Sequence, residues 1–183
     1  IHVVYVHKNY KGGNKMGKTT KIFKVFAIIA TIAFSAWVII RTVKEVQFNM
    51  NCSQYIERAA NANTVETAKE ELAKAISYAE ENDLTKGIVS IFFHQPQNDV
   101  EYWYKNMTES YAELEKLPED ATSIEKTNVL MNLRETLTDQ EGVSVTIPSG
   151  ISIYPNNVAY FLWGLLSGIF GLVFWSKVVF TED

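Results

Sequence analysis

Two long runs of apolar residues dominate the hydrophobic pattern, one toward each end of the chain. The first, IFKVFAIIATIAFSAWVII, occupies residues 22–40 and is interrupted only by Lys24, whose side chain can reach a membrane interface. The second, VAYFLWGLLSGIFGLVFWS, occupies residues 158–176 and carries no charge. As a helix, each run would rise about 28 Å, close to the hydrocarbon thickness of a bilayer. Both runs are therefore predicted to be transmembrane helices.

A cleaved signal peptide is the alternative for the first run, because the basic stretch MGKTTKIFK precedes it. Signal cleavage favours small residues at the first and third positions before the cut. A cut after Ala36 would place Phe34 at the third position, and a cut after Ala33 would place Thr31 there. Neither site fits well, so we expect an uncleaved anchor.

Between the two runs, residues 41–141 show apolar positions at helical spacing, which predicts a small helical bundle. The first helix is expected to continue outward as far as the interruption NANT, with its apolar positions at Val43, Val46, Met50, Tyr55, Ile56, Ala59 and Ala60. A second helix, VETAKEELAKAISYAEEN, follows Asn63 or Thr64 as its cap and ends before Lys86 and Gly87.

Capping-box patterns mark two more helices in this segment. Asn98 and Glu101 precede a stripe formed by Val100, Trp103, Met107, Tyr111 and Leu114. Thr122 and Glu125 precede a stripe formed by Ile124, Leu130, Leu133 and Leu137. The predicted fold class is thus a mostly α membrane protein, with two transmembrane helices flanking a small helical bundle and a short extended or β segment.

The extended part is predicted at two uncharged stretches. IVSIFF, residues 88–93, is β-branched and aromatic, and is expected to be a strand or a buried connector. GVSVTIPSGISIYPNN, residues 142–157, is expected to be an extended connector or hairpin that pairs with the first stretch and covers the base of the bundle. The nearby aromatic residues are interpreted as core side chains, with a binding surface as the alternative: Phe92, Phe93, Tyr102, Trp103, Tyr104 and Tyr111.

Charge is segregated along the chain. Residues 1–24 contain six Lys and no acid, whereas residues 41–157 contain ten Lys or Arg against nineteen Asp or Glu, a formal net charge of −9. This balance argues against nucleic acid as a partner. Lys residues before the first run, together with Lys177 after the second, predict that both termini (residues 16–21 and 177–183) are cytoplasmic. The central domain is then periplasmic or extracellular, in a cell inner membrane.

The stretch KGGNKMGKTTK raises the question of whether Met16 is the start of the protein. Codons for the five residues before Met16 can contain AAGGAGG seven bases ahead of the ATG, which is a bacterial ribosome-binding site. This predicts that residues 1–15 are a translated leader in a bacterial or phage protein. The alternative is an authentic basic tail.

Candidate catalytic residues are few. Cys52 is the only cysteine, and His94 is the only histidine outside residues 1–15. Nothing in the pattern brings these two together as a nucleophilic pair. His94 with Asp99 and Glu101 matches no recognised metal-ligand spacing, and the two acids fit better as helix N-terminal residues. We therefore expect a non-enzymatic protein without cofactor or metal.

Cys52 is a candidate for an intermolecular disulfide, with a free thiol as the alternative.

Small residues form the most specific pattern in the apolar runs. Close helix approach in lipid depends on small residues, so either the two spans pack within one chain or the second span dimerises. Three aromatic residues toward the ends of the second run are expected near the headgroups: Tyr160, Trp163 and Trp175. The candidate packing residues are Gly164, Ser167, Gly168 and Gly171 in the second run and Ala27, Thr31 and Ser35 in the first.

The order of span, helical segment and span resembles in outline the ligand-sensing part of bacterial chemoreceptors, a resemblance of layout that no motif carries. Only residues 177–183 follow the second run, so a sensor built this way would need a separate signalling partner. The expected function is association with a second copy or with another membrane protein, as an accessory subunit or envelope assembly factor. A small-molecule sensor domain is the alternative, and an enzyme that uses His94 is the third hypothesis.

Overall fold

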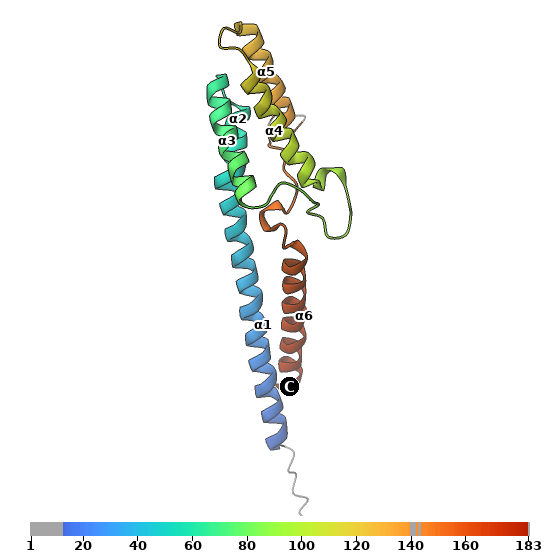
Figure 1. Ribbon diagram of the computed structural model, residues 1–183. Helices are drawn as coiled ribbons and strands as arrows, with labels where there is room; N and C mark the ends of the chain where they lie inside the picture. The colour runs from blue at the N-terminus through green and yellow to red at the C-terminus, as the bar shows by residue number, and fades with distance from the viewer. Residues whose placement is uncertain (1–12, 140–141, 143, 183) are drawn as a thin grey trace, which may run out of the picture. The chain divides into compact units, whose positions relative to one another are not determined.

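The computed structural model describes residues 13–139, 142 and 144–182 (Figure 1). Most of the predicted leader and the last residue of the predicted tail therefore lie outside the described residues. The chain divides into two compact units. One consists of the residues up to Ile39 together with those from Phe161 onward and is called the helix pair below. The other, Ile40–Tyr160, is called the helical domain.

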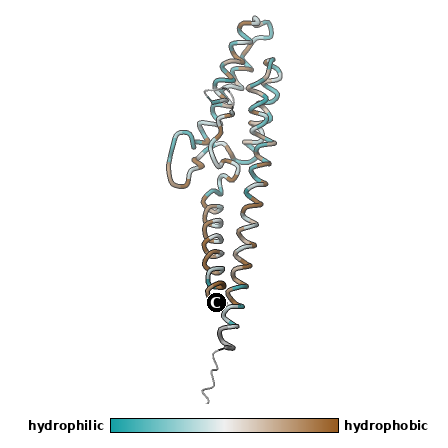
Figure 2. The backbone as a smooth tube through the Cα atoms, turned by 180° about the vertical axis from the view of Figure 1, so that it is seen from behind, coloured by the Kyte–Doolittle hydropathy of each residue, from teal (hydrophilic) through white to brown (hydrophobic). Residues whose placement is uncertain are grey.

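The helix pair is formed by the first part of α1 (Gly13–Phe48) and most of α6 (Asn157–Glu182). Hydrophobic residues are concentrated along both helices (Figure 2). The segments Gly17–Ala60 and Asn157–Thr181 are long and apolar enough to cross a membrane, by length and composition. Only 11% of the most apolar window of each is buried within the chain, so most of this apolar surface is left to contact something other than the chain itself.

The helical domain contains the end of α1, a π-helical turn η1 (Asn49–Ser53), α2 (Gln54–Ala60), α3 (Val65–Glu81), α4 (Val100–Lys116) and α5 (Ser123–Leu137). In the domain, α2 and α3 form one helical hairpin and α4 and α5 form another, and the two pack together (Figure 1). Because α1, η1 and α2 run on without a break, the described residues form five helical segments besides short 3-10 turns, and they contain no β-strand. The mostly α prediction is therefore confirmed.

Two of the predicted helix caps are confirmed and one is corrected. Thr122 and Glu125 form the expected capping box, since the Glu125 carboxylate accepts the Thr122 backbone N–H at 2.8 Å. Thr64 caps α3. The cap of α4 is Asp99 and not Asn98, because the Asp99 carboxylate accepts the backbone N–H groups of two residues in the first turn.

The continuation of the first helix is confirmed, but its predicted apolar stripe is only half right. The buried residues on this part of the chain are Phe48, Cys52, Ile56, Ala59 and Ala60, whereas Val43, Val46 and Met50 are exposed. The turn η1 closes i→i+5 hydrogen bonds and so takes up one extra residue. That extra residue rotates the buried face of the helix relative to a pattern counted at 3.6 residues per turn.

Of the two alternatives for residues 88–93, the strand is wrong: the stretch is a connector, with Val89 buried but Phe92 and Phe93 exposed. The described backbone has one isolated bridge there, between Ile88 and Asp99. The described residues of the connector, 142 and 144–157, also form no ladder with this stretch, and they include a 3-10 turn, η3 (Ile151–Ile153). A side chain connects the two segments instead, because the Asn157 amide donates to the Val89 carbonyl at 2.8 Å.

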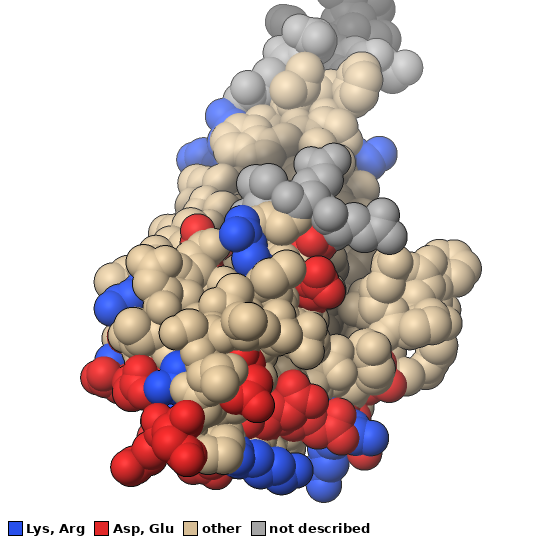
Figure 3. All heavy atoms as spheres, turned by 90° about the horizontal axis from the view of Figure 1, so that it is seen from above, with Lys and Arg blue, Asp and Glu red and all other residues tan. Residues whose placement is uncertain are grey.

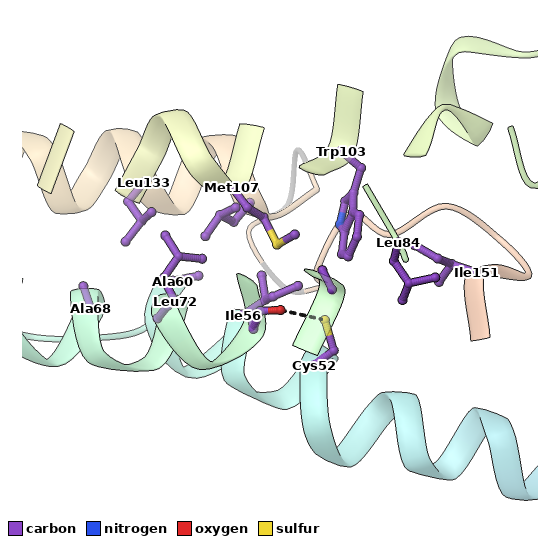
Figure 4. Close-up of a cluster of buried hydrophobic side chains, with 14 of the residues drawn as sticks. Cys52, Ile56, Ala60, Ala68, Leu72, Leu84, Trp103, Met107, Leu133 and Ile151 are labelled. Atoms are coloured by element: carbon purple, nitrogen blue, oxygen red, sulfur yellow. Dashed lines mark hydrogen bonds between the residues drawn. The ribbon is translucent and has the colours of Figure 1, made fainter. Parts of the chain in front are cut away.

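The core of the domain lies between the two hairpins. Met107 of α4 and Leu133 of α5 point toward Ile56 and Leu72 of the α2–α3 hairpin (Figure 4). Trp103 is buried as predicted, but three of the aromatic residues interpreted as core are exposed: Phe92, Phe93 and Tyr102. Ile124 was also predicted to face the core and is 72% exposed, because α5 packs through Leu133 and Leu137 near its other end.

Candidate functional site

Gly164 provides the closest approach in the helix pair. A Cβ atom at this position would lie 2.5 Å from the Trp37 ring of α1. A Cβ at Gly168 would lie 3.5 Å from the Phe34 ring, and one at Gly171 would lie 3.9 Å from the Ala30 Cβ. These contacts run antiparallel and stay within one chain. The glycine strip of α6 is therefore occupied by α1, and self-association of the second helix stays a prediction.

The other four candidate packing residues are placed differently from one another. Ala27 is fully buried, and Ser167 is buried with its hydroxyl donating to the Trp163 carbonyl one turn earlier. Thr31 and Ser35 are exposed, so they do not form the close-packed strip that their spacing with Ala27 suggested. The wide rings of Trp37 and Phe34 fill the space above the glycines, a role that a search for small residues does not detect.

Two indole groups of α6 tie it to α1. The Trp175 N–H donates to the Thr31 hydroxyl at 3.1 Å, and that hydroxyl donates in turn to the Ala27 carbonyl at 2.8 Å. The Trp163 N–H donates to the Ala33 carbonyl at 3.1 Å. The two tryptophans were expected to act as headgroup anchors at the ends of the run, but their N–H groups bond near the middle of the first apolar run.

Replacing Thr31 by valine is expected to weaken the α1–α6 association, because the valine keeps the shape but leaves the Trp175 N–H without this acceptor. Hydrogen bonds between helices in lipid contribute about 0.6–2 kcal/mol each. Thermal unfolding of the full chain in detergent measures the loss. Thr31→Ser retains the hydroxyl and should behave like the parent, and equal melting temperatures for both variants would contradict the role of this bond.

Cys52 lies in η1 at the centre of the helical domain. Its side chain is fully buried, and the thiol points at the Ala75 carbonyl of α3 at 3.8 Å (Figure 4). Burial raises the pKa of this thiol from 9.0 to about 12. A disulfide between two copies would require the packing of η1 against α3 to open. The thiol is thus free in this fold, and the intermolecular disulfide stays a prediction that the burial disfavours.

We expect Cys52 to react with maleimide only when the domain opens. At pH 8 the thiolate fraction is roughly a thousandfold smaller at a pKa of about 12 than at 9.0. The folded pKa is the higher one, so the stabilising contribution of this group is complete below pH 9 and is lost as the pH rises toward 12. Maleimide labelling rates of the full chain with and without urea measure the protection of Cys52, and fast labelling of the folded chain would contradict its burial.

His94 and the acids near it do not converge. His94 is exposed on the loop that precedes α4, whereas Cys52 lies in the core. The Asp99 carboxylate is engaged as the cap of α4. In the part of the chain that the structure describes, no group of three His, Cys, Asp or Glu side chains is placed to hold a metal ion.

A cavity of about 260 Å³ opens at the N-terminal end of α4. Its walls come from the 3-10 turn η2 (Pro96–Asn98), the first turns of α4, the end of α5 and the connector. The volume is just below the 300–1,000 Å³ typical of ligand pockets, so it suits a small molecule or a side chain of a partner. Most of the exposed lining surface is apolar, although polar residues contribute to it. The cavity is lined by Pro96, Gln97, Asp99, Tyr102, Trp103, Asn106, Thr136, Leu137, Thr146 and Pro148.

Acidic side chains gather along one edge of the domain surface, with some Lys and Arg among them (Figure 3). Glu71 of α3 is buried, and its Oε1 accepts hydrogen bonds from Arg58 at 2.9 Å and Lys74 at 3.1 Å. The Tyr104 hydroxyl donates to Glu80 at 2.6 Å, and this bond raises the pKa of Tyr104 to about 12. Glu71 and Glu80 thus join α3 to α2 and α4, and the exposed acids give the domain a solvated face.

Comparison with the models of known protein families, with curated proteins and with solved structures finds no match.

Proposed function

We propose that the protein is a non-enzymatic integral membrane protein of a bacterium or phage, anchored by α1 and α6. It displays the helical domain on the periplasmic or extracellular side of the inner membrane, with both termini in the cytoplasm. There it acts by association with another membrane protein, as an accessory subunit or envelope assembly factor.

The membrane part of the proposal rests on the helix pair. Its two helices leave most of their apolar surface uncovered by the chain. Where they face each other, they approach closely at small residues and are joined by hydrogen bonds between the helices. This is the packing expected where the surrounding solvent is lipid. The orientation rests on the Lys residues that flank the two runs.

The association part rests on one observation, the exposed aromatic surface of a domain whose core is already filled. Four helices bury their apolar stripes against one another, and Tyr102 is still 61% exposed at the rim of the cavity beside α4. Exposed aromatic side chains beside a concave surface are typical of protein contact sites. The net charge of −9 on residues 41–157 favours a basic partner surface.

Site-specific photo-crosslinking tests the association. A photoreactive phenylalanine derivative is placed at Tyr102 and, as a control, at Asn128, which is exposed on α5. Irradiation of cells of the source organism should give a discrete protein adduct from Tyr102 and none from Asn128. An adduct of twice the chain mass would identify a second copy as the partner. Uncrosslinked chain at both positions would contradict the proposal.

A small-molecule sensor domain is the second candidate, and the 260 Å³ cavity is the observation that favours it. In this case, small aromatic alcohols and amides should raise the melting temperature of the full chain in a saturable way. Thr136→Trp fills the cavity and should remove that rise. The absence of any shift across the panel would favour the association function over the sensor.

A further inference from the structure

The loop between Gly87 and Asn98 exposes two adjacent aromatic side chains on the helical domain. Its twelve residues, GIVSIFFHQPQN, contain no Asp, Glu, Lys or Arg. At its tip, Phe92 is 66% exposed and Phe93 is 74% exposed. Two large adjacent rings on a domain surface mark a contact site, because water is a poor environment for both.

Hydrogen bonds tie this loop to the start of α6. The Asn157 amide donates to the Val89 carbonyl at 2.8 Å and to the Gly150 carbonyl at 3.1 Å, and the Tyr154 hydroxyl donates to the Lys86 carbonyl at 2.7 Å. Gly87 has φ of +100°, and a Cβ there would overlap the Tyr154 hydroxyl, so the close approach at this point depends on glycine. The base of the loop is therefore held beside Asn157, which directly precedes Val158, the first residue of the second apolar run.

The tip of the loop stays close to this tie. Phe93 is four residues beyond Val89, and even a fully extended chain of that length spans only about 14 Å. The chain is not extended there, because the Phe93 backbone N–H donates to the Ser90 hydroxyl at 3.0 Å and turns the loop back. The two rings therefore lie within a short distance of the residue at which α6 becomes continuously apolar.

We propose that the Phe92–Phe93 tip inserts into the membrane interface, in the leaflet on the side of the helical domain. This inference rests on the proposed function, since it takes α6 as a membrane span. A span that starts at Val158 places Asn157 at the headgroup level, and aromatic rings partition to that level. The connector, residues 142–157, is uncharged as well, so both segments joined at Asn157 lack the charges that would oppose contact with the interface.

Spin-label accessibility in vesicles tests the insertion. The full chain is reconstituted in phosphatidylcholine and phosphatidylglycerol vesicles with a nitroxide on a cysteine introduced at Phe93, at Ile124 or at Leu172. Ile124 is the matched control, an apolar side chain of nearly the same exposure on α5, and Leu172, 76% exposed on α6, reports on the span. The native Cys52 is buried, and the chain without an added cysteine provides the blank.

The proposal predicts that the label at Phe93 collides several-fold less often with a water-soluble nickel chelate, and more often with oxygen, than the label at Ile124. The same collision rates at Phe93 and Ile124, with Leu172 in lipid, would overturn the insertion and leave the span intact. Shielding of Phe93 from both reagents would overturn it in favour of a protein contact. Contact of Leu172 with water would overturn the span and the insertion together.

Discussion

Replacing Gly164 by alanine is expected to disrupt the packing of α1 against α6, whereas the same replacement at Gly168 is tolerated. The added methyl group at Gly164 would lie 2.5 Å from the Trp37 ring, against 3.5 Å from the Phe34 ring at Gly168. The first distance forces the ring or the helix to move, and overpacking of this kind costs about 1–3 kcal/mol. The second distance is an ordinary van der Waals contact.

A disulfide between the two helices measures this difference. The Ala30 Cβ and a Cβ at Gly171 would be 3.9 Å apart, within the range of native disulfides. The chain with Ala30→Cys and Gly171→Cys should therefore crosslink under oxidant, and the two halves should stay together on a non-reducing gel after a protease cut in the domain. Adding Gly168→Ala should leave the yield unchanged, and adding Gly164→Ala should lower it. Equal yields in both backgrounds would show that Gly164 is not the point of closest approach.

Replacing Leu72 by alanine is expected to destabilise the helical domain strongly. Leu72 is fully buried between the two hairpins, and a leucine-to-alanine cavity at such a site costs about 2–5 kcal/mol. Ile124→Ala removes a side chain of similar size from a largely exposed position and should change the stability by less than about 0.5 kcal/mol.

The buried thiol of Cys52 provides the measurement for this pair. Brief maleimide pulses at increasing urea concentration, applied to the full chain in detergent, report the fraction of domains that have opened. The urea midpoint should fall clearly for Leu72→Ala and stay near the parent for Ile124→Ala. A shift of similar size for both variants would mean that α5 packs through Ile124 as the sequence pattern suggested.

Much of the helical framework follows from local signals in the sequence. The stripe of Val100, Trp103, Met107 and Leu114 is buried as its spacing predicts, and the Thr122–Glu125 capping box starts α5. These predictions are correct because the interactions that produce the stripe and the capping box lie within one or two helical turns. The glycine spacing in the second run likewise indicates a packing face, since it depends on the chemistry of a single helix.

The features that sequence reasoning missed depend on contacts between distant segments. The turn η1 moves the buried face of the first helix, and no residue in NMNCS signals a π-turn. Residues 88–93 have the composition of a strand, but no other strand pairs with them among the described residues. The Asn157 and Tyr154 side chains donate to backbone carbonyls in and next to this stretch instead. The indole bonds to Thr31 and Ala33 are equally non-local, so the tryptophans resembled simple interfacial anchors.

The central claim is that the helical domain and the chain's N-terminal region lie on opposite sides of a membrane, and cysteine accessibility tests it most directly. Gly17→Cys and Asn128→Cys are exposed positions that leave every charged residue in place, and buried Cys52 contributes little labelling. In intact cells, a membrane-impermeant maleimide should label Asn128→Cys at once and Gly17→Cys only after permeabilisation. Labelling of Gly17→Cys in intact cells, or of Asn128→Cys only after lysis, would contradict the account.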